Sequence, residues 1–326
     1  MKTLVTGGCG FIGSHLVERL VAEGHAVVVL DDLATGRREN LSAAPGARLI
    51  EADVADHAAI APFFDGVDVV FHLAGLADIV PSIDDPLRYH RANVDGTIAV
   101  LEASRKAGVG RIVYAASSSC YGIPDVYPTP ETAPVRPQYP YAHTKWAAEQ
   151  AVLHWAAVYG LAANSLRLFN VYGPRSRTSG AYGAVFGVFL AQRANGAPLT
   201  VVGDGTQARD FVFVSDVVEA FLLAAVSTAT GEVFNIGAGV PHTVARLARL
   251  IGGPVIHIPK RPGEPDVTHA DISKAARLLG WRPRVPFEDG VGIMTGRLRD
   301  WTAAPVWTPD TIEEATRDWF RHLGKR

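Results

Sequence analysis

Short aliphatic runs alternate with longer amphipathic segments through the first half of the chain, and this alternation limits the possible folds more than any other feature. Uninterrupted aliphatic strands that alternate with helices indicate a parallel sheet covered on both faces. We expect strands at residues 2–6, 26–30, 48–51, 67–73, 111–115 and 163–169, and helices at residues 12–22, 93–107 and 141–159. The sequence therefore predicts an α/β fold with a doubly wound parallel sheet, which binds ligands beyond the carboxyl ends of its strands.

The pattern loosens beyond residue 170, where Gly and Pro become frequent. We expect a nucleotide-binding domain at residues 1–169 and a smaller C-terminal substrate-binding lobe at residues 170–300, with residues 207–225 packing back on the main sheet. Residues 301–326 form a tail. Its apolar side chains recur at helical spacing after the start signal Thr308-Pro309, which predicts a helix docked on the body.

Composition excludes several classes of protein. The formal net charge of the 326-residue chain is -2, so nothing suggests a nucleic-acid partner or an anionic membrane surface. Cys9 and Cys120 are too few for a disulfide framework or a four-cysteine zinc site, and we expect no metal. Reduced thiols, the lack of a signal-peptide core and the lack of a membrane-length apolar run favour a cytoplasmic protein.

A glycine-rich loop, TGGCGFIG at residues 6–13, follows the first expected strand and opens the first expected helix. The dinucleotide fingerprint is satisfied either by Gly8, Gly10 and Gly13 or, at a wider spacing, by Gly7, Gly10 and Gly13. Glycine permits the tight turn and the close approach of backbone to a pyrophosphate, and the helix N-terminus supplies free N–H groups. This strand–loop–helix context predicts a dinucleotide site.

An acidic residue, Asp31, stands eighteen positions after Gly13 at the end of the second strand. A carboxylate there accepts hydrogen bonds from the adenosine ribose hydroxyls and repels a 2′-phosphate, so NAD is favoured over NADP. Arg37 and Arg38 follow, and they keep NADP as the alternative.

Tyr141 and Lys145 are one helical turn apart at the start of an expected helix. A neighbouring ammonium and a cationic nicotinamide ring favour the phenolate, so we expect the pKa of Tyr141 to be lowered. The pair can then take a proton from an alcohol while hydride leaves its carbon. Ser117, just beyond the fifth strand, can hydrogen-bond the reacting oxygen. Ser118 and Ser119 are expected to form a turn or to support the reacting groups from behind.

Together these motifs resemble the extended short-chain dehydrogenase/reductase family, which has a Rossmann-type sheet, and within it the UDP-glucose 4-epimerase-like enzymes. The resemblance runs from Lys2 to about Gly292. It is carried in order by TGGCGFIGSH, LDDLATG, EADV, HLAG, NVDGT, SSSCYG, YAHTK, LRLFNVYGPR, GDGTQARDFVFVSD, FNIGAG and RPGEPDVTHADISKAARLLGW.

The resemblance implies a role for each matching position. The residues implied to hold NAD are Gly7, Gly10, Phe11, Ile12, Gly13, Asp31, Asp53, Val54, Leu73, Ala74, Gly75, Asn93, Tyr141 and Lys145. Ser117, Tyr141 and Lys145 are implied to be catalytic. Asn170 is implied to contact the nucleotide-sugar, Arg209 and Arg261 its pyrophosphate, and Glu264 its ribose in place of the family's usual aspartate.

The implied reaction oxidises the sugar C4 hydroxyl with bound NAD, turns the 4-keto sugar over and returns the hydride to its other face. Dehydratases of the family carry an acid pair where this chain has Ser118 and Ser119, so epimerisation is the default. A reductase or dehydratase of a deoxysugar pathway and a non-catalytic NAD-binding protein remain alternatives. The family also implies a homodimer formed through the helices at residues 93–107 and 141–159.

The sugar is open at this point. Thr268 occupies a position where glucose-restricted enzymes carry a bulky tyrosine. The smaller threonine favours substrates with an N-acetyl group at C2. Arg177 matches an arginine that reads the C6 carboxylate in UDP-glucuronate 4-epimerases, but Asn170 is threonine in those enzymes. UDP-glucose/galactose and the UDP-N-acetylhexosamines are equally favoured, and UDP-glucuronate is the alternative.

Overall fold

The computed structural model describes residues 1–176 and 183–324. The strands of the main sheet are β1 (Lys2–Thr6), β2 (Ala26–Asp31), β3 (Arg48–Glu51), β4 (Val69–His72), β5 (Arg111–Ser117), β6 (Ala163–Leu168) and β11 (Glu232–Ile236). The other strands are β7 (Asn170–Tyr172), β8 (Leu199–Val202), β9 (Ala208–Arg209), β10 (Phe211–Phe213), β12 (His242–Thr243) and β13 (Val255–Ile258).

The main sheet is parallel and has the strand order β11-β6-β5-β4-β1-β2-β3. Its first six strands in sequence follow the 3-2-1-4-5-6 order of dinucleotide-binding folds. The doubly wound Rossmann-type prediction is therefore confirmed. The strand order reverses between β1 and β4, which places a ligand crevice at the carboxyl ends of these strands.

β11 has no counterpart among the strands expected from the sequence. This strand pairs with β6 throughout, from Glu232 with Asn164 to Ile236 with Leu168. Residues 170–300 therefore do not all belong to a separate lobe, because β11 lies within this stretch and completes the main sheet. The run EVFNI is short and carries a polar residue at each end of its apolar centre, so it lacks the aliphatic pattern of the other strands.

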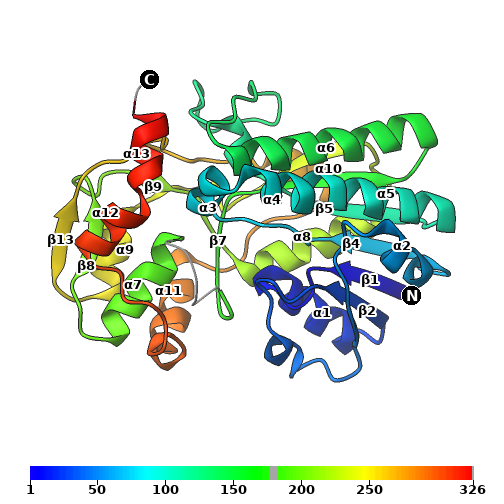
Figure 1. The fold of residues 1–326 in the computed structure, drawn as a ribbon, viewed down its shortest axis with the longest axis horizontal. Coiled ribbons are helices and arrows are strands. Elements are labelled where there is room, and N and C mark those ends of the chain that lie inside the picture. Colours follow the sequence, from blue (N-terminus) through cyan, green and yellow to red (C-terminus); the bar gives the residue numbers. More distant parts are fainter. Residues whose placement is uncertain (177–182, 325–326) are drawn as a thin grey trace.

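Helices cover both faces of the sheet (Figure 1). The helices of the nucleotide-binding half are α1 (Phe11–Ala22), α2 (His57–Ile60), α3 (Ile79–Asp84), α4 (Pro86–His90), α5 (Gly96–Ala107), α6 (Pro140–Tyr159) and α8 (Val214–Val226). Alternate residues of a strand face opposite layers. Val5 and Val29 pack with α1 and α8, whereas Leu4 and Leu30 pack with α5 and α6.

Two predicted elements differ from the structure in detail. The helix expected at residues 93–107 begins as a π-helical segment, Arg91–Asp95, before α5. The stretch expected to pack back from residue 207 contains β10, which pairs with β7, and α8, which packs against α1 and strands β5 and β6.

A second core lies beside the carboxyl edge of the sheet. Its helices are α7 (Val185–Ala194), α9 (Val244–Ile251), α11 (Phe287–Thr295) and α12 (Pro309–Ala315). Two other helices lie outside this core: α10 (Ser273–Leu279) packs on the main sheet, and α13 (Arg317–Leu323) packs against α3. The core is aromatic: the rings of Tyr172 and Phe186 stack with centroids 4.3 Å apart, and Trp301 is fully buried. No helix of residues 1–176 and 183–324 has the length and apolar character needed to cross a membrane.

The C-terminal tail forms two short helices where one was expected. Thr308 caps α12 through a reciprocal capping box with Thr311. The chain then bends at Thr316, whose hydroxyl bonds back to the carbonyl of Ile312. Trp319 is buried, and α13 packs against α3.

Candidate functional site

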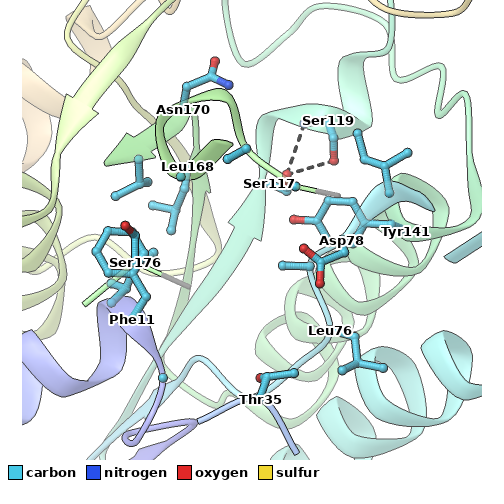
Figure 2. A pocket seen from close by; sticks show the side chains of 18 of the residues that line it. Phe11, Thr35, Leu76, Asp78, Ser117, Ser119, Tyr141, Leu168, Asn170 and Ser176 are labelled. Carbon is cyan, nitrogen blue, oxygen red and sulfur yellow. Dashed lines mark hydrogen bonds between the residues drawn. The ribbon is translucent and has the colours of Figure 1, made fainter. Parts of the chain in front are cut away.

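A cavity of about 670 Å³ runs along the carboxyl ends of the main-sheet strands and into the second core. Figure 2 shows part of its wall, with Phe11 and Thr35 near one side and Ser117, Tyr141 and Asn170 across from them. Ligand pockets of this size commonly bind cofactors and small molecules.

The glycine loop has the geometry of a pyrophosphate cradle. Gly7 has φ +70°, and a Cβ on Gly13 would lie 2.2 Å from the Gly7 carbonyl oxygen. Gly7, Gly10 and Gly13 line the cavity, as do Phe11 and Ile12 at the start of α1. The free N–H groups of that helix end suit an anion.

The structure also resolves the two possible glycine spacings. A Cβ on Gly8 would lie 2.7 Å from a methyl group of Val29, so Gly8 faces the sheet. Gly7 has the positive φ and lines the cavity. The wider spacing, with Gly7, Gly10 and Gly13, is therefore the one that forms the cradle.

Asp31 ends β2 at the cavity wall and is only 6% exposed. Its carboxylate accepts N–H groups from Cys9 at 2.8 Å and Leu33 at 2.9 Å. Burial raises the pKa of Asp31, and these two donors act in the opposite direction. Arg37 lines the cavity, whereas Arg38 is ion-paired with Glu51.

The neighbouring Cys9 is a packing residue. It is fully buried, and burial raises the pKa of its thiol to about 12. A thiol in that state is a poor nucleophile.

Most of the other predicted NAD residues line the cavity: Asp53, Val54, Leu73, Ala74 and Gly75. Asn93 does not. Its amide lies behind the loop, where it accepts the N–H of Leu76 at 2.7 Å and donates to the carbonyl of Leu76 and the hydroxyl of Thr144. Asn93 therefore shapes the dinucleotide wall from behind, and its implied role in holding NAD stays a prediction.

The three predicted catalytic residues meet at the centre of the cavity. Ser117 ends β5, and Tyr141 and Lys145 lie on the first turns of α6. The Ser117 hydroxyl is 2.8 Å from that of Ser119 (Figure 2). The Lys145 ammonium lies 4.5 Å from the ring centroid of Tyr114, beneath the site.

Burial raises the pKa of Tyr141, while the hydroxyls of Ser117 and Ser119 act to lower it. Burial also lowers the pKa of Lys145 to about 7, although the Glu149 carboxylate opposes that shift. Among the protein's own groups, desolvation therefore outweighs the groups that favour the phenolate. The lowered pKa expected beside a cationic nicotinamide ring stays a prediction.

Three further residues lie beside the catalytic tyrosine, and only Asp78 was not singled out from the sequence. Ser119 was expected to form a turn or to support the reacting groups, and its hydroxyl does reach Ser117 and acts to lower the pKa of Tyr141. Asp78 lies beside the phenol (Figure 2), and its charge raises the pKa of Tyr141. Tyr139 stacks on the ring of Tyr141 with centroids 6.4 Å apart. A carboxylate three positions after HLAG was the visible signal for Asp78.

At the far end, Thr268 and Asn170 are coupled. The Thr268 hydroxyl donates to the Asn170 side-chain oxygen at 2.8 Å and accepts the N–H of Asp210 at 2.9 Å. Both side chains line the cavity. The hydroxyl of Thr268 thus fixes the side-chain oxygen of Asn170 at the cavity wall.

Two arginines face the same end of the cavity. Arg209 and Arg261 both contact the Glu264 carboxylate, at 3.8 and 3.3 Å. Glu264 therefore holds both guanidinium groups. Planar guanidinium forks pair well with phosphate oxygens. Arg177, the residue predicted to read a C6 carboxylate, lies outside the described residues.

Comparison with known proteins agrees with this geometry. A model of the NAD dependent epimerase/dehydratase family matches residues 3–237. A UDP-glucose 4-epimerase of Mycolicibacterium smegmatis is 40% identical over 305 residues, an alignment that covers 89% of this chain and 96% of that protein.

Two solved structures are also close. The UDP-glucose 4-epimerase of Thermotoga maritima with UDP-glucose is 37% identical with a TM-score of 0.87, covering 92% of this chain and 99% of that chain. The UDP-N-acetylglucosamine 4-epimerase from Methanobrevibacter ruminantium, in complex with UDP-N-acetylmuramic acid, is 32% identical with a TM-score of 0.86, covering 92% and 97%. The resemblance seen in the sequence motifs is confirmed: the chain belongs to the NAD-dependent epimerase/dehydratase family.

Proposed function

We propose that this protein is an NAD-dependent 4-epimerase of UDP-hexoses. The observation that carries the proposal is one continuous cavity with three parts: a backbone cradle at one end, Ser117 and Tyr141 at the centre, and Arg209 and Arg261 at the other end. A dinucleotide and a nucleotide diphosphate-sugar that meet at a tyrosine need this arrangement.

The chain's own residues divide the chemistry. The backbone of residues 7–13 and the Asp31 carboxylate would hold NAD, which when bound supplies the hydride acceptor and donor for the sugar carbon. The Tyr141 oxygen takes the proton of the sugar hydroxyl and returns it. Ser117 hydrogen-bonds that oxygen, and Ser119 holds the Ser117 hydroxyl in place.

Lys145 supports the tyrosine as a charge. Its amino group is buried. When this group is protonated, its positive charge stabilises the phenolate strongly, because the protein interior screens charges less than water does. Arg209 and Arg261 neutralise the pyrophosphate and fix the distance of the sugar from Tyr141. Asn170, oriented by Thr268, completes the wall beside the sugar.

The proposed substrates are UDP-glucose and UDP-galactose or their N-acetyl forms. Thr268, a small side chain that lines the cavity beside Asn170, supports the acceptance of a C2 substituent. UDP-glucuronate remains the alternative, and it depends on Arg177. A dehydratase or reductase is the second class, which the two serines at positions 118 and 119 disfavour because they supply no acid.

We also propose a homodimer formed through α5 and α6. These helices pack against each other, and apolar side chains on and beside them are exposed, including Leu87, Ile98 and Val158. Light scattering of the purified protein tests this, and Ile98→Glu should shift it toward the monomer. A monomeric wild-type protein would contradict the dimer.

A cytoplasmic location is proposed as well, because both cysteines are buried free thiols that suit a reducing compartment. Cell fractionation tests this proposal. The proposed partners are UDP-sugars, without nucleic acid or membrane.

The deciding experiment is incubation with UDP-glucose, UDP-N-acetylglucosamine and UDP-glucuronate without added NAD, with product stereochemistry read by NMR. An epimerase converts at least one of them to its C4 isomer and releases no NADH. A requirement for external dinucleotide, or a product of changed mass, would refute epimerisation in favour of the second class.

A further inference from the structure

The C-terminal tail reaches the cavity. Trp319, in the middle of α13, is 2% exposed and lines the cavity together with Arg261 and Tyr139. Phe320, the next residue along the helix, is 39% exposed. One face of α13 therefore forms part of the cavity wall, while its neighbouring residue faces outward.

Trp319 holds the loop that carries the substrate arginine. Its indole N–H donates to the carbonyl oxygen of Pro262 at 2.7 Å, one residue after Arg261. The Arg261 guanidinium carbon lies 5.6 Å from the centroid of the Trp319 rings, within the range of a cation–π contact. One turn later in the helix, the Leu323 side chain packs beside Gly263. The helix thus fixes both the backbone and the side chain at residue 261.

The indole of Trp319 also contacts the aromatic side chain beside the catalytic tyrosine. The ring centroids of Trp319 and Tyr139 are 6.3 Å apart, and Tyr139 in turn stacks on Tyr141 with an interplanar angle of 7°. A single tail residue therefore touches both the arginine at the far end of the cavity and the stack at its centre.

We propose that Trp319 is a positioning residue that sets Arg261 for the diphosphate of the substrate, so that the C-terminal tail completes the substrate site. This inference rests on the proposed function, which gives Arg261 its ligand. Apolar cover for α3 would require only a hydrophobic side chain. Covering α3 does not explain the hydrogen bond to Pro262 or the contact with Arg261, because each of these orients the loop and neither covers an apolar surface.

The test uses UDP itself as the probe, titrated by calorimetry into the full-length protein. We expect Trp319→Ala to weaken UDP binding about tenfold and to raise the KM for UDP-glucose by a similar factor, a size in keeping with a desolvated cation–π contact and a lost hydrogen bond. The kcat should stay within about threefold, and the NAD content should not change. Phe320→Ala is the matched control and should leave all four quantities and the melting temperature unchanged.

Trp319→Phe keeps an aromatic ring over Arg261 and removes only the N–H, so its UDP affinity should fall between the wild type and Trp319→Ala. It carries the test if Trp319→Ala does not fold. A double-mutant cycle with Arg261→Ala identifies the route. If Trp319 acts through Arg261, adding Trp319→Phe to Arg261→Ala should weaken UDP binding no further.

Unchanged UDP affinity in the folded Trp319 variants, or additive losses in the cycle, would overturn this inference while leaving the epimerase proposal intact. Wild-type protein that binds no UDP would refute the proposed function and the inference with it. Because calorimetry needs no turnover, the two failures are distinguishable.

Discussion

The two ends of the cavity are built from different parts of the polypeptide. The dinucleotide end is made mostly of backbone: Gly7 and Gly13 bring the main chain close, and N–H groups hold Asp31. The sugar-nucleotide end is made of side chains carried by loops and by the tail, in which Glu264 and Trp319 hold Arg261. A backbone site tolerates little change, whereas a side-chain site can be altered one residue at a time.

The dinucleotide end is therefore the part that we expect the protein to share with its relatives. The sugar-nucleotide end is the part that can differ with the substrate. A cradle of glycines cannot distinguish one sugar from another. At the other end, Arg209 and Arg261 are proposed to meet the diphosphate that all UDP-sugars share, and Asn170 and Thr268 are proposed to meet the sugar, which varies. Substitutions at the two ends should therefore affect different measured constants, and substitutions at the centre should affect neither binding constant.

The largest effect is expected at the centre, where Tyr141→Phe removes the proton acceptor. We expect kcat to fall by about 10²–10⁴, the usual contribution of a positioned acid or base. NAD content and UDP affinity should change little, since the ring and its stack on Tyr139 remain. Near-normal turnover would eliminate Tyr141 as the base.

Gly13→Ala tests the backbone end. Its Cβ would meet the Gly7 carbonyl at 2.2 Å, so the loop must move. We expect NAD affinity to drop about a hundredfold with a loss of stability of about 1–3 kcal/mol. The control is Gly292→Ala in α11, where nothing lies within 4 Å of an added Cβ and helix propensity predicts a small gain. Equal NAD binding by both variants would contradict the cradle.

Arg209→Ala tests the side-chain end. The loss of one charge-assisted contact should raise the KM for the UDP-sugar about tenfold, with NAD binding unchanged. Steady-state kinetics and retained NAD are the measurements. If NAD is lost and KM is not, the two ends are not independent.

The smallest effect concerns Lys145 and pH. Burial lowers its pKa to about 7 in the folded state, so between pH 7 and its ordinary value the unfolded chain binds more protons. Stability should therefore rise with pH across this range. Urea unfolding of wild type and Lys145→Met at pH 7 and pH 9, at one fixed NAD concentration, should show the wild type gaining relative to the variant. A parallel response of both proteins would rule out this assignment.

The sequence predicted the sheet and most of the site for the same reason: aliphatic runs and fixed-spacing motifs are local. Residues whose role depends on distant packing were harder. Asn93 carries a matching motif, but only the fold shows that its amide turns toward Leu76 and Thr144. The raised pKa of Tyr141 depends on burial by several elements, which no local pattern reports.

The tail shows the same limit. Helical spacing predicted that it docks, and the capping box at Thr308 is readable from residues 308–311. Its meeting with Arg261 could not be inferred, because 57 positions separate the indole of Trp319 from the carbonyl of Pro262. Local rules find the element, and tertiary structure decides what it touches.

The late arrival of β11 has a consequence for biosynthesis. Until residues 232–236 are synthesised, β6 is the outermost strand on its side, with a row of open backbone groups. A nascent chain that has produced the cofactor cradle is thus still exposed to pairing with other chains. During synthesis this edge stays without its partner strand for 64 further residues, the distance from Leu168 to Glu232.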